Sequence, residues 1–159
     1  MIRFSSRYMI AALLLCGSVH FAQAQKTMEE YEVFPTRLET DTPYRIPAIA
    51  TASNGDLIAV ADYRYCRMDI GFAGTGDGRI DLRASISKDN GHTWEAPFTI
   101  VKGKGRGFDV FHTGFGDPCV VADRNSSRVF LLSCAGNVSF PGGTREKHQG
   151  IAIMHSEDN

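Results

Sequence analysis

The sequence predicts an all-β protein of the β-propeller class. Residues 87–94 read Ser-Lys-Asp-Asn-Gly-His-Thr-Trp, a turn-forming segment, and its opening recurs as Ser-Glu-Asp-Asn at 156–159, 69 residues later (156 − 87). Strand-like and turn-like segments alternate between the two copies, and no convincing helix is predicted after residue 24. A turn repeated at this interval in a β-rich chain indicates stacked, similar four-stranded sheets, which are the blades of a propeller.

About two such blades fit into the 159 residues. Two blades cannot close a ring, and their open edges and faces would need cover. The second copy of the turn also stops before its glycine. We therefore expect this chain to be the front part of a longer protein, truncated within the second repeat.

Residues 1–24 have the features of a secretion signal. Two arginines and an apolar run occupy residues 3–16, and an A-x-A cleavage site follows at 22–24. The apolar run is too short to span a bilayer. A lipoprotein signal ending at Cys16 is the alternative, but the later A-x-A site favours ordinary cleavage. We expect residues 25–159 to be the mature chain and to be secreted, periplasmic or on the cell surface, without insertion into the membrane.

Charge excludes some partners of the mature chain. Without the two leader arginines, 15 basic residues face 18 acidic ones, a net charge near −3. Nothing in this balance suggests binding to nucleic acid or to a membrane surface. An anionic ligand would have to be bound by individually placed arginines.

The cysteines do not predict a disulfide framework or a metal site. Cys16 leaves with the leader, so Cys66, Cys119 and Cys134 remain, an odd number. Cys119 and Cys134 lie on neighbouring predicted strands and could pair, although buried thiols that pack as small apolar groups are the favoured alternative. No spacing typical of a metal site occurs, and we expect no cofactor.

The first repeat unit contains four predicted strands joined by turns. Ser53 to Asp56 is a strong hairpin turn, in which the glycine supplies a positive φ. Ile80 to Ser87 alternates apolar and polar residues with the period of a sheet strand. The predicted strands are 46–51, 57–63, 80–87 and 98–101, and a glycine-rich loop at 71–78 separates the second strand from the third.

The second unit repeats this order. Residues 117–122 correspond to 46–51 with an offset of 71 (118 − 47). A turn at 124–127 follows, residues 129–134 take the place of 58–63, and residues 150–155 form the third strand.

The segment 87–94 explains itself as a turn. Asp89 can accept hydrogen bonds from backbone N–H groups, Gly91 can adopt a positive φ, and Trp94 can pack its ring on the sheet. The alternative, that Ser87 and Asp89 are catalytic or bind a metal, is not needed to account for these residues. The pattern Ser-x-Asp-x-Gly-x-Thr-Trp is the Asp box, found in sialidases and in several unrelated secreted propellers, so alone it supports a fold and not an activity.

Several motifs in order resemble the N-terminal part of bacterial secreted sialidases (neuraminidases). They are Tyr-Arg-Ile-Pro at 44–47, Ala-Asp-Tyr-Arg at 61–64, an Asp-bearing loop and the Asp box at 87–94. Gly-Asp-Pro at 116–118 and Cys-Ala-Gly at 134–136 fit the second blade. The resemblance covers nearly all of the mature chain. It implies a six-bladed propeller that binds glycoproteins, glycolipids or oligosaccharides ending in sialic acid.

The resemblance implies that Arg45 is the first of three arginines that grip the carboxylate of sialic acid. A guanidinium is always charged, and its planar fork matches a carboxylate bidentately. The alternative is a surface arginine that begins a strand.

Asp69, 24 residues after Arg45, resembles the general acid/base of the family. A loop position lets its carboxyl lean over the glycosidic oxygen, and we expect partial burial to keep it protonated. The rivals are Asp62, Asp77 and Asp81. Asp81 lies within a predicted strand and Asp77 in a turn, so both favour structural roles.

Two further residues resemble ligand contacts. Arg64 is similar to an accessory arginine beside the carboxylate and the 4-hydroxyl, and Asp117 is similar to an acidic residue at the sugar's 4-position. An ordinary salt bridge or a turn cap remains an open alternative for both.

The resemblance implies a tyrosine nucleophile, which avoids bringing a carboxylate against a substrate that already carries one. That tyrosine, its glutamate base and two more arginines would come from later blades, so we expect the 159-residue chain alone to be inactive. A non-catalytic carbohydrate-binding Asp-box propeller is the alternative, and a trans-sialidase is a related one. The sequence does not separate hydrolysis from transfer or indicate a linkage preference.

Overall fold

The computed structural model describes residues 29–35, 44–65, 69–71, 78–106 and 110–158. The predicted leader and Asp77 lie outside these ranges. Within them the chain is all-β, as predicted, with one short 3-10 helix, η1 (Phe140–Gly142). None of the described helices is long and apolar enough to cross a membrane.

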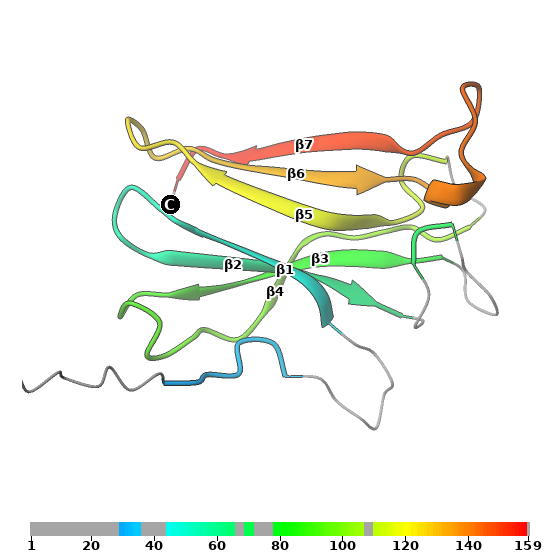
Figure 1. Ribbon diagram of the computed structural model, residues 1–159. Coiled ribbons are helices and arrows are strands. Elements are labelled where there is room, and N and C mark those ends of the chain that lie inside the picture. The colour runs from blue at the N-terminus through cyan, green and yellow to red at the C-terminus, as the bar shows by residue number, and fades with distance from the viewer. Residues whose placement is uncertain (1–28, 36–43, 66–68, 72–77, 107–109, 159) are drawn as a thin grey trace, which may run out of the picture. The chain divides into compact units, whose positions relative to one another are not determined.

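The first sheet is a four-stranded antiparallel meander (Figure 1). The turn that joins its first two strands has Gly55 at φ +94°, and Ala52 N–H donates to Asp56 O at 2.8 Å, so the predicted hairpin is confirmed. The four predicted strands are all present, with β1 beginning two residues earlier than expected. They are β1 (Tyr44–Thr51), β2 (Leu57–Arg64), β3 (Ile80–Ser87) and β4 (Phe98–Val101).

The second sheet has three antiparallel strands in the described residues. They are β5 (Phe115–Ala122), β6 (Val129–Ala135) and β7 (Gly150–Ser156). The strands follow one another in chain order, as in the first sheet. The three strands predicted for the second unit are therefore present, in the predicted order.

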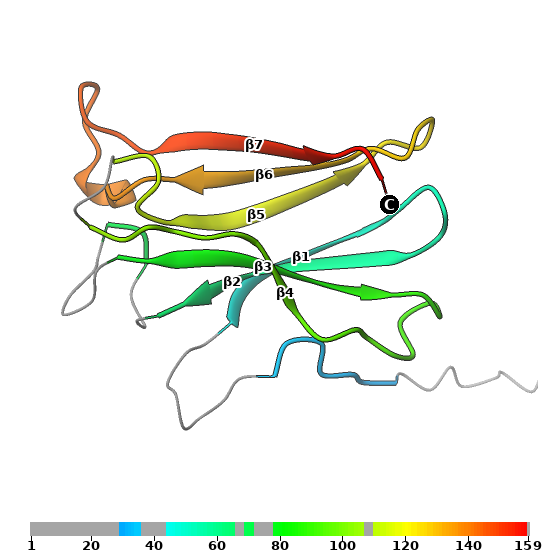
Figure 2. The ribbon, with the colours of Figure 1, turned by 180° about the vertical axis from the view of Figure 1, so that it is seen from behind.

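The core lies between the two sheets, which face each other in both views (Figure 2). Leu82 is fully buried, and burial of a leucine side chain contributes about 1.5–3 kcal/mol. The predicted alternation along β3 is only partly visible in its burial, because Asp81, Ser85 and Ser87 are also buried by polar partners. The core cluster comprises Val60, Leu82 and Ala84 from the first sheet and Phe115, Leu131, Ala135 and Ala152 from the second.

The predicted alignment of the second strands is wrong by one residue. In register, Leu57 follows the first turn and Val129 follows the second, an offset of 72 (129 − 57) instead of 71. The second turn is one residue longer, and a slip of one residue exchanges the two faces of a strand. By register, Asp62 corresponds to Cys134, because Asp62 pairs with Arg45 and Cys134 pairs with Gly116.

Both sheets begin with the same backbone irregularity. The register of the first strand shifts between Arg45 and Ala48, and that of β5 shifts between Gly116 and Cys119. Ile46 has φ 52° and Asp117 has φ 53°, and each stands before a proline. A bulge with this geometry bends the strand and turns its neighbouring side chains.

The turn at 87–94 has the hydrogen bonds that its residue types predict. Asp89 accepts from the backbone N–H of Thr93 at 2.8 Å and from its hydroxyl at 2.5 Å. Ser87 Oγ donates to Asp89 at 2.8 Å and accepts from the N–H of Gly91, which has φ +94°. The half-buried Trp94 donates its indole N–H to Gly91 O at 3.1 Å. The hydrogen bonds from the hydroxyl and the N–H of Thr93, with a smaller contribution from Ser87, lower the pKa of Asp89 to about 2.

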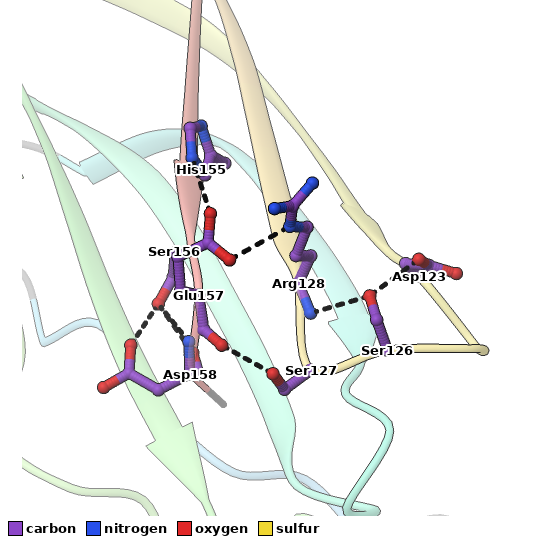
Figure 3. Close-up of polar contacts among 8 residues, drawn as sticks. All are labelled: Asp123, Ser126, Ser127, Arg128, His155, Ser156, Glu157 and Asp158. Carbon is purple, nitrogen blue, oxygen red and sulfur yellow. Dashed lines mark hydrogen bonds and ion pairs between the residues drawn. The ribbon is translucent and has the colours of Figure 1, made fainter.

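The second copy begins in the same way and is fastened to the neighbouring hairpin (Figure 3). Ser156 Oγ donates to Asp158 Oδ1 at 2.6 Å, the counterpart of the bond between Ser87 and Asp89. Arg128 Nε donates to Glu157 Oε2 at 3.0 Å, and Ser127 Oγ donates to Glu157 O at 2.5 Å. The end of β7 is thus held by the turn between β5 and β6.

Candidate active site

The predicted site residues lie where β1 and β5 begin and β2 ends. Arg45 is exposed at the bulge of β1, and its Cα is paired in register with that of Asp62 in β2. Asp117 occupies the equivalent bulge of β5 and is also exposed. In an antiparallel pair the start of one strand lies beside the end of its neighbour. These positions therefore come together at the same end of the strands in the two sheets.

A buried ion pair between Asp62 and Arg64 lies among these strand ends. Asp62 and Arg64 are two residues apart on one strand, so their side chains emerge on the same face. Arg64 Nη2 and Nε donate to Asp62 Oδ2 at 2.7 and 3.1 Å, and both side chains are 0% exposed. A buried charge of this kind persists only with a partner, since an unpaired one costs several kcal/mol.

Asp69 joins this pair from the loop that follows β2. Its Oδ1 lies 3.2 Å from Arg64 Nη2 and accepts the backbone N–H of the buried Ile70 at 2.7 Å. The Asp69 side chain is 48% exposed, so about half of it is covered, in agreement with the partial burial expected for this carboxyl. The neighbouring Ile70 turns inward and is buried.

The second sheet contributes to the same cluster through backbone. The N–H of Asp117 donates to Asp62 Oδ1 at 3.0 Å, so the two oxygens of Asp62 serve different partners. A Cβ at Gly116 would lie 3.3 Å from Asp62 Oδ2 and 3.2 Å from Ile70, so this position has little room for a side chain. Nearby, burial and the carboxylate of Asp117 raise the pKa of the Cys134 thiol.

Burial changes the acid strength of Asp62. Removal from water raises its pKa from 3.8 to about 6, while its hydrogen bonds and charge interaction with Arg64 oppose the rise. Asp62 was a rival of Asp69 as the acid/base. Asp62 is 0% exposed, whereas the Asp69 side chain is 48% exposed, so Asp69 is the more accessible of the two carboxyls.

Arg64 is placed differently from the exposed Arg45. The sequence left open whether Arg64 contacts a ligand or forms a salt bridge, and the structure shows the salt bridges to Asp62 and Asp69. Its Nη1 atom is buried and has no hydrogen-bond partner among the residues that the structure describes. In the described structure Arg64 therefore connects two carboxylates.

The remaining rival, Asp81, belongs to a separate network. It is 0% exposed and accepts from Tyr65 Oη at 2.9 Å, from Arg79 at 3.2 Å and from the N–H of Gly103 at 3.0 Å. These partners support the structural role predicted for it. No group of His, Cys, Asp or Glu suited to a metal ion occurs among the residues that the structure describes.

Sequence reasoning missed the central place of Asp62. The available signal was the Asp-x-Arg spacing on a strand, which places a carboxylate and a guanidinium on one face. The bond from Asp117 had no local signal, because its two residues are 55 positions apart in the chain.

Comparison with known proteins gives this arrangement a context. No protein-family model matches the chain. A sialidase of Paraclostridium sordellii is 27% identical over 121 residues, which cover 73% of this chain and 27% of that protein. The chain therefore spans about a quarter of the length of this curated relative.

Solved structures agree on the fold. A Hadza microbial sialidase matches with a TM-score of 0.56 and 23% identity, covering 72% of this chain and 24% of the other. A leech intramolecular trans-sialidase, solved with 2,7-anhydro-Neu5Ac, matches with a TM-score of 0.52 and 21% identity over 78% of this chain and 21% of its own. The two sheets are thus partial blades of a β-propeller of the sialidase type, and the predicted fold class is confirmed.

Proposed function

We infer that this chain, a relative of sialidases over 73% of its length, forms part of the catalytic propeller of an exo-α-sialidase that removes terminal sialic acids from glycoconjugates. The observation that carries this proposal is the row of charged groups from Arg45 through the buried Asp62–Arg64 pair to the exposed Asp69. The exposed guanidinium of Arg45 can bind the carboxylate of an acidic sugar, and the exposed carboxyl of Asp69 can exchange a proton with its glycosidic bond.

Arg45 would bind the carboxylate of sialic acid. Its side chain is exposed at a bulge, which fixes the strand's direction at that point. A charge-assisted hydrogen bond between guanidinium and carboxylate is about twice as strong as one between neutral groups. The negative charge of the mature chain makes such a local cation the principal means of attracting an anionic sugar.

Asp69 would donate a proton to the leaving oxygen and later withdraw one from water. Its exposure allows contact with a glycosidic bond, and Arg64 and the Ile70 N–H restrict the position of one carboxylate oxygen. The other oxygen would then face the substrate. General acid–base catalysis of this kind contributes about 10²–10⁴-fold to a rate.

The tyrosine nucleophile, its glutamate and two further arginines would belong to a longer protein of which this chain is a part. On this proposal, the 159-residue chain does not turn over sialosides by itself. Secretion by the leader at 1–24 would bring the protein to its glycoconjugate substrates.

The test compares the 159-residue chain with the longer protein on 3′-sialyllactose, with product analysis. We expect turnover by the longer protein, no turnover by this chain, and a loss of about 10²–10⁴-fold in kcat for Asp69→Asn. Asp123→Asn, in the turn between β5 and β6, is the matched control and should keep full activity. Free sialic acid would indicate hydrolysis, and a 2,7-anhydro sugar would indicate intramolecular transfer.

Binding of sialosides without any turnover by the longer protein would contradict the proposal. It would favour the non-catalytic carbohydrate-binding propeller instead.

A further inference from the structure

Asp62 is hydrogen-bonded to site residues of both sheets, Arg64 in the first and Asp117 in the second. It is fully buried, and each of its carboxylate oxygens has its own partners. Oδ2 accepts two hydrogen bonds from Arg64 on the same strand, and Oδ1 accepts the backbone N–H of Asp117 from the other sheet. A carboxylate used at both oxygens in this way restrains two segments at once.

The bonds on Oδ2 reach the proposed acid/base. Arg64 is held by Asp62 at 2.7 Å, and the same Nη2 atom of Arg64 lies 3.2 Å from Asp69 Oδ1. Because Arg64 is 0% exposed, its guanidinium cannot reorient into solvent if one partner is lost. The position of Asp69 therefore depends on Asp62 through Arg64.

The bond on Oδ1 reaches the second sheet. Asp117 has φ 53° at the bulge of β5, and its N–H points at Asp62 over 3.0 Å. Gly116, directly before it, leaves 3.3 Å between a would-be Cβ and Asp62 Oδ2. The bulge thus closes against the carboxylate, and the exposed Asp117 side chain is presented from that fixed backbone.

We propose that Asp62 is a positioning residue of the sialidase reaction, which sets Asp69 through Arg64 and Asp117 through its backbone N–H, and so aligns site residues from two blades. This rests on the proposed function. Asp62 itself makes no contact with substrate. Its role is to hold the acid/base and a sugar-contacting residue in one geometry, and misplacement of such groups by about 1 Å can cost about 10²-fold in rate.

The chain contains a matched control for this proposal. Asp81 is equally buried, is bonded to an arginine two residues away and accepts a distant backbone N–H, from Gly103. Its partners Arg79 and Tyr65 are not part of the proposed site. Asp81→Asn therefore removes a buried carboxylate of the same kind without touching the Asp62 network.

The experiment is NMR spectroscopy of the 159-residue chain, in the wild type, Asp62→Asn and Asp81→Asn. In the wild type, the amide proton of Asp117 and the Nε proton of Arg64 should titrate together with a midpoint near the Asp62 pKa of about 6. The charged or titratable groups around Asp62 are Arg64 on its own strand, Asp69 on the following loop, Asp117 and Cys134 from the second sheet, and Arg45 opposite it on β1.

In Asp62→Asn both titrations should disappear, and the carboxyl carbon of Asp69 should shift, whereas Asp81→Asn should leave all three signals as in the wild type. An Asp117 amide that does not titrate, or an Asp69 signal unchanged in Asp62→Asn, would overturn the proposal. Gly116→Ala provides a second variant should Asp62→Asn fail to fold. It presses on Asp62 and should displace the Asp117 and Asp69 signals but not those of Tyr65 and Gly103.

The longer protein supplies a kinetic readout. Asp62→Asn should lower kcat by about 10²-fold, while Asp81→Asn should keep kcat. Equal kcat losses in both variants would show a merely structural role and overturn the proposal. Absence of sialoside turnover in the wild type would refute the proposed function, and the NMR measurements would still decide whether Asp62 positions its partners.

Discussion

The two sheets share a backbone plan and differ in the side chains that it presents. In each, the first strand has a positive-φ residue before a proline and is joined to the second by a hairpin, and the third strand ends at a turn that opens with a serine bonded to an aspartate. At one register position the first sheet has Asp62 opposite Arg45, and the second has Cys134 opposite Gly116. The repeat therefore preserves the backbone geometry, and the buried ion pair belongs to the first copy.

The difference shows how a repeated scaffold acquires a single site. The first sheet supplies the buried charges, and the second supplies a backbone N–H for Asp62 and, at Gly116, a position without a side chain against which Asp62 packs. A second pair of buried charges at the Cys134 position would need its own partners, and none is present among the described residues of that sheet. Three predictions would break or sharpen this comparison.

The largest effect should come from truncation of the register-equivalent residues. Asp62→Ala removes the partner of the fully buried Arg64 and should lower the free energy of unfolding by about 3–5 kcal/mol. Cys134→Ala should cost under about 1 kcal/mol, because its half-buried thiol is a small apolar group. Urea unfolding of both variants measures the contrast. Equal losses in the free energy of unfolding would show that the two positions contribute equally to stability.

The pH dependence of stability should also separate the sheets. Because the folded pKa of Asp62 is raised from 3.8 to about 6, its stabilising contribution is fully present below pH 3.8 and is lost as the pH rises through 6. This amounts to about 3 kcal/mol between pH 4 and pH 7. The measurement is the difference in free energy of unfolding between the wild type and Asp62→Asn at each pH, which cancels the contributions of other carboxylates.

That difference should fall as the pH is raised over this interval. A difference that is constant, or that grows with pH, would show that the ion pair with Arg64 outweighs the burial of Asp62.

The smallest effect should come from the two bulges. Ile46 is β-branched and has φ 52°, a conformation that costs an ordinary residue about 1–2 kcal/mol, whereas aspartate at 117 tolerates φ 53° more readily. Ile46→Asn should therefore raise the free energy of unfolding by about 1 kcal/mol, since Ile46 is already 39% exposed. Asp117→Asn should change it by less than about 0.5 kcal/mol. A destabilised Ile46→Asn variant would mean that the isoleucine packs more than it strains.

The strands and turns could be predicted because their signals are local. β3 and β4 have the expected bounds, and the turn at Asp89 forms from residues within eight positions of one another. The correspondence of β2 and β6 could not be predicted as well. One extra residue in the second hairpin shifts the register, and the sequence pattern does not say which residue is extra.

In the candidate site, too, some features could be predicted from the sequence and others could not. Arg45, Arg64, Asp69 and Asp117 were found from motifs, and the structure brings Arg64, Asp69 and the backbone of Asp117 to Asp62. The complete burial of Arg64 had no sequence signal. Burial is a property of everything that surrounds a side chain.

The amino-acid sequence by itself determined the all-β repeat, the positions of the strands and the residue types that the chemistry requires. It could do so because hydrophobic periodicity and turn preferences act over a few neighbouring residues. Only the tertiary structure decides which charges are buried and what they hold. Asp62 and Asp117 are separated by 55 positions, and their bond exists because two sheets stack with the register and the bulges that place them together.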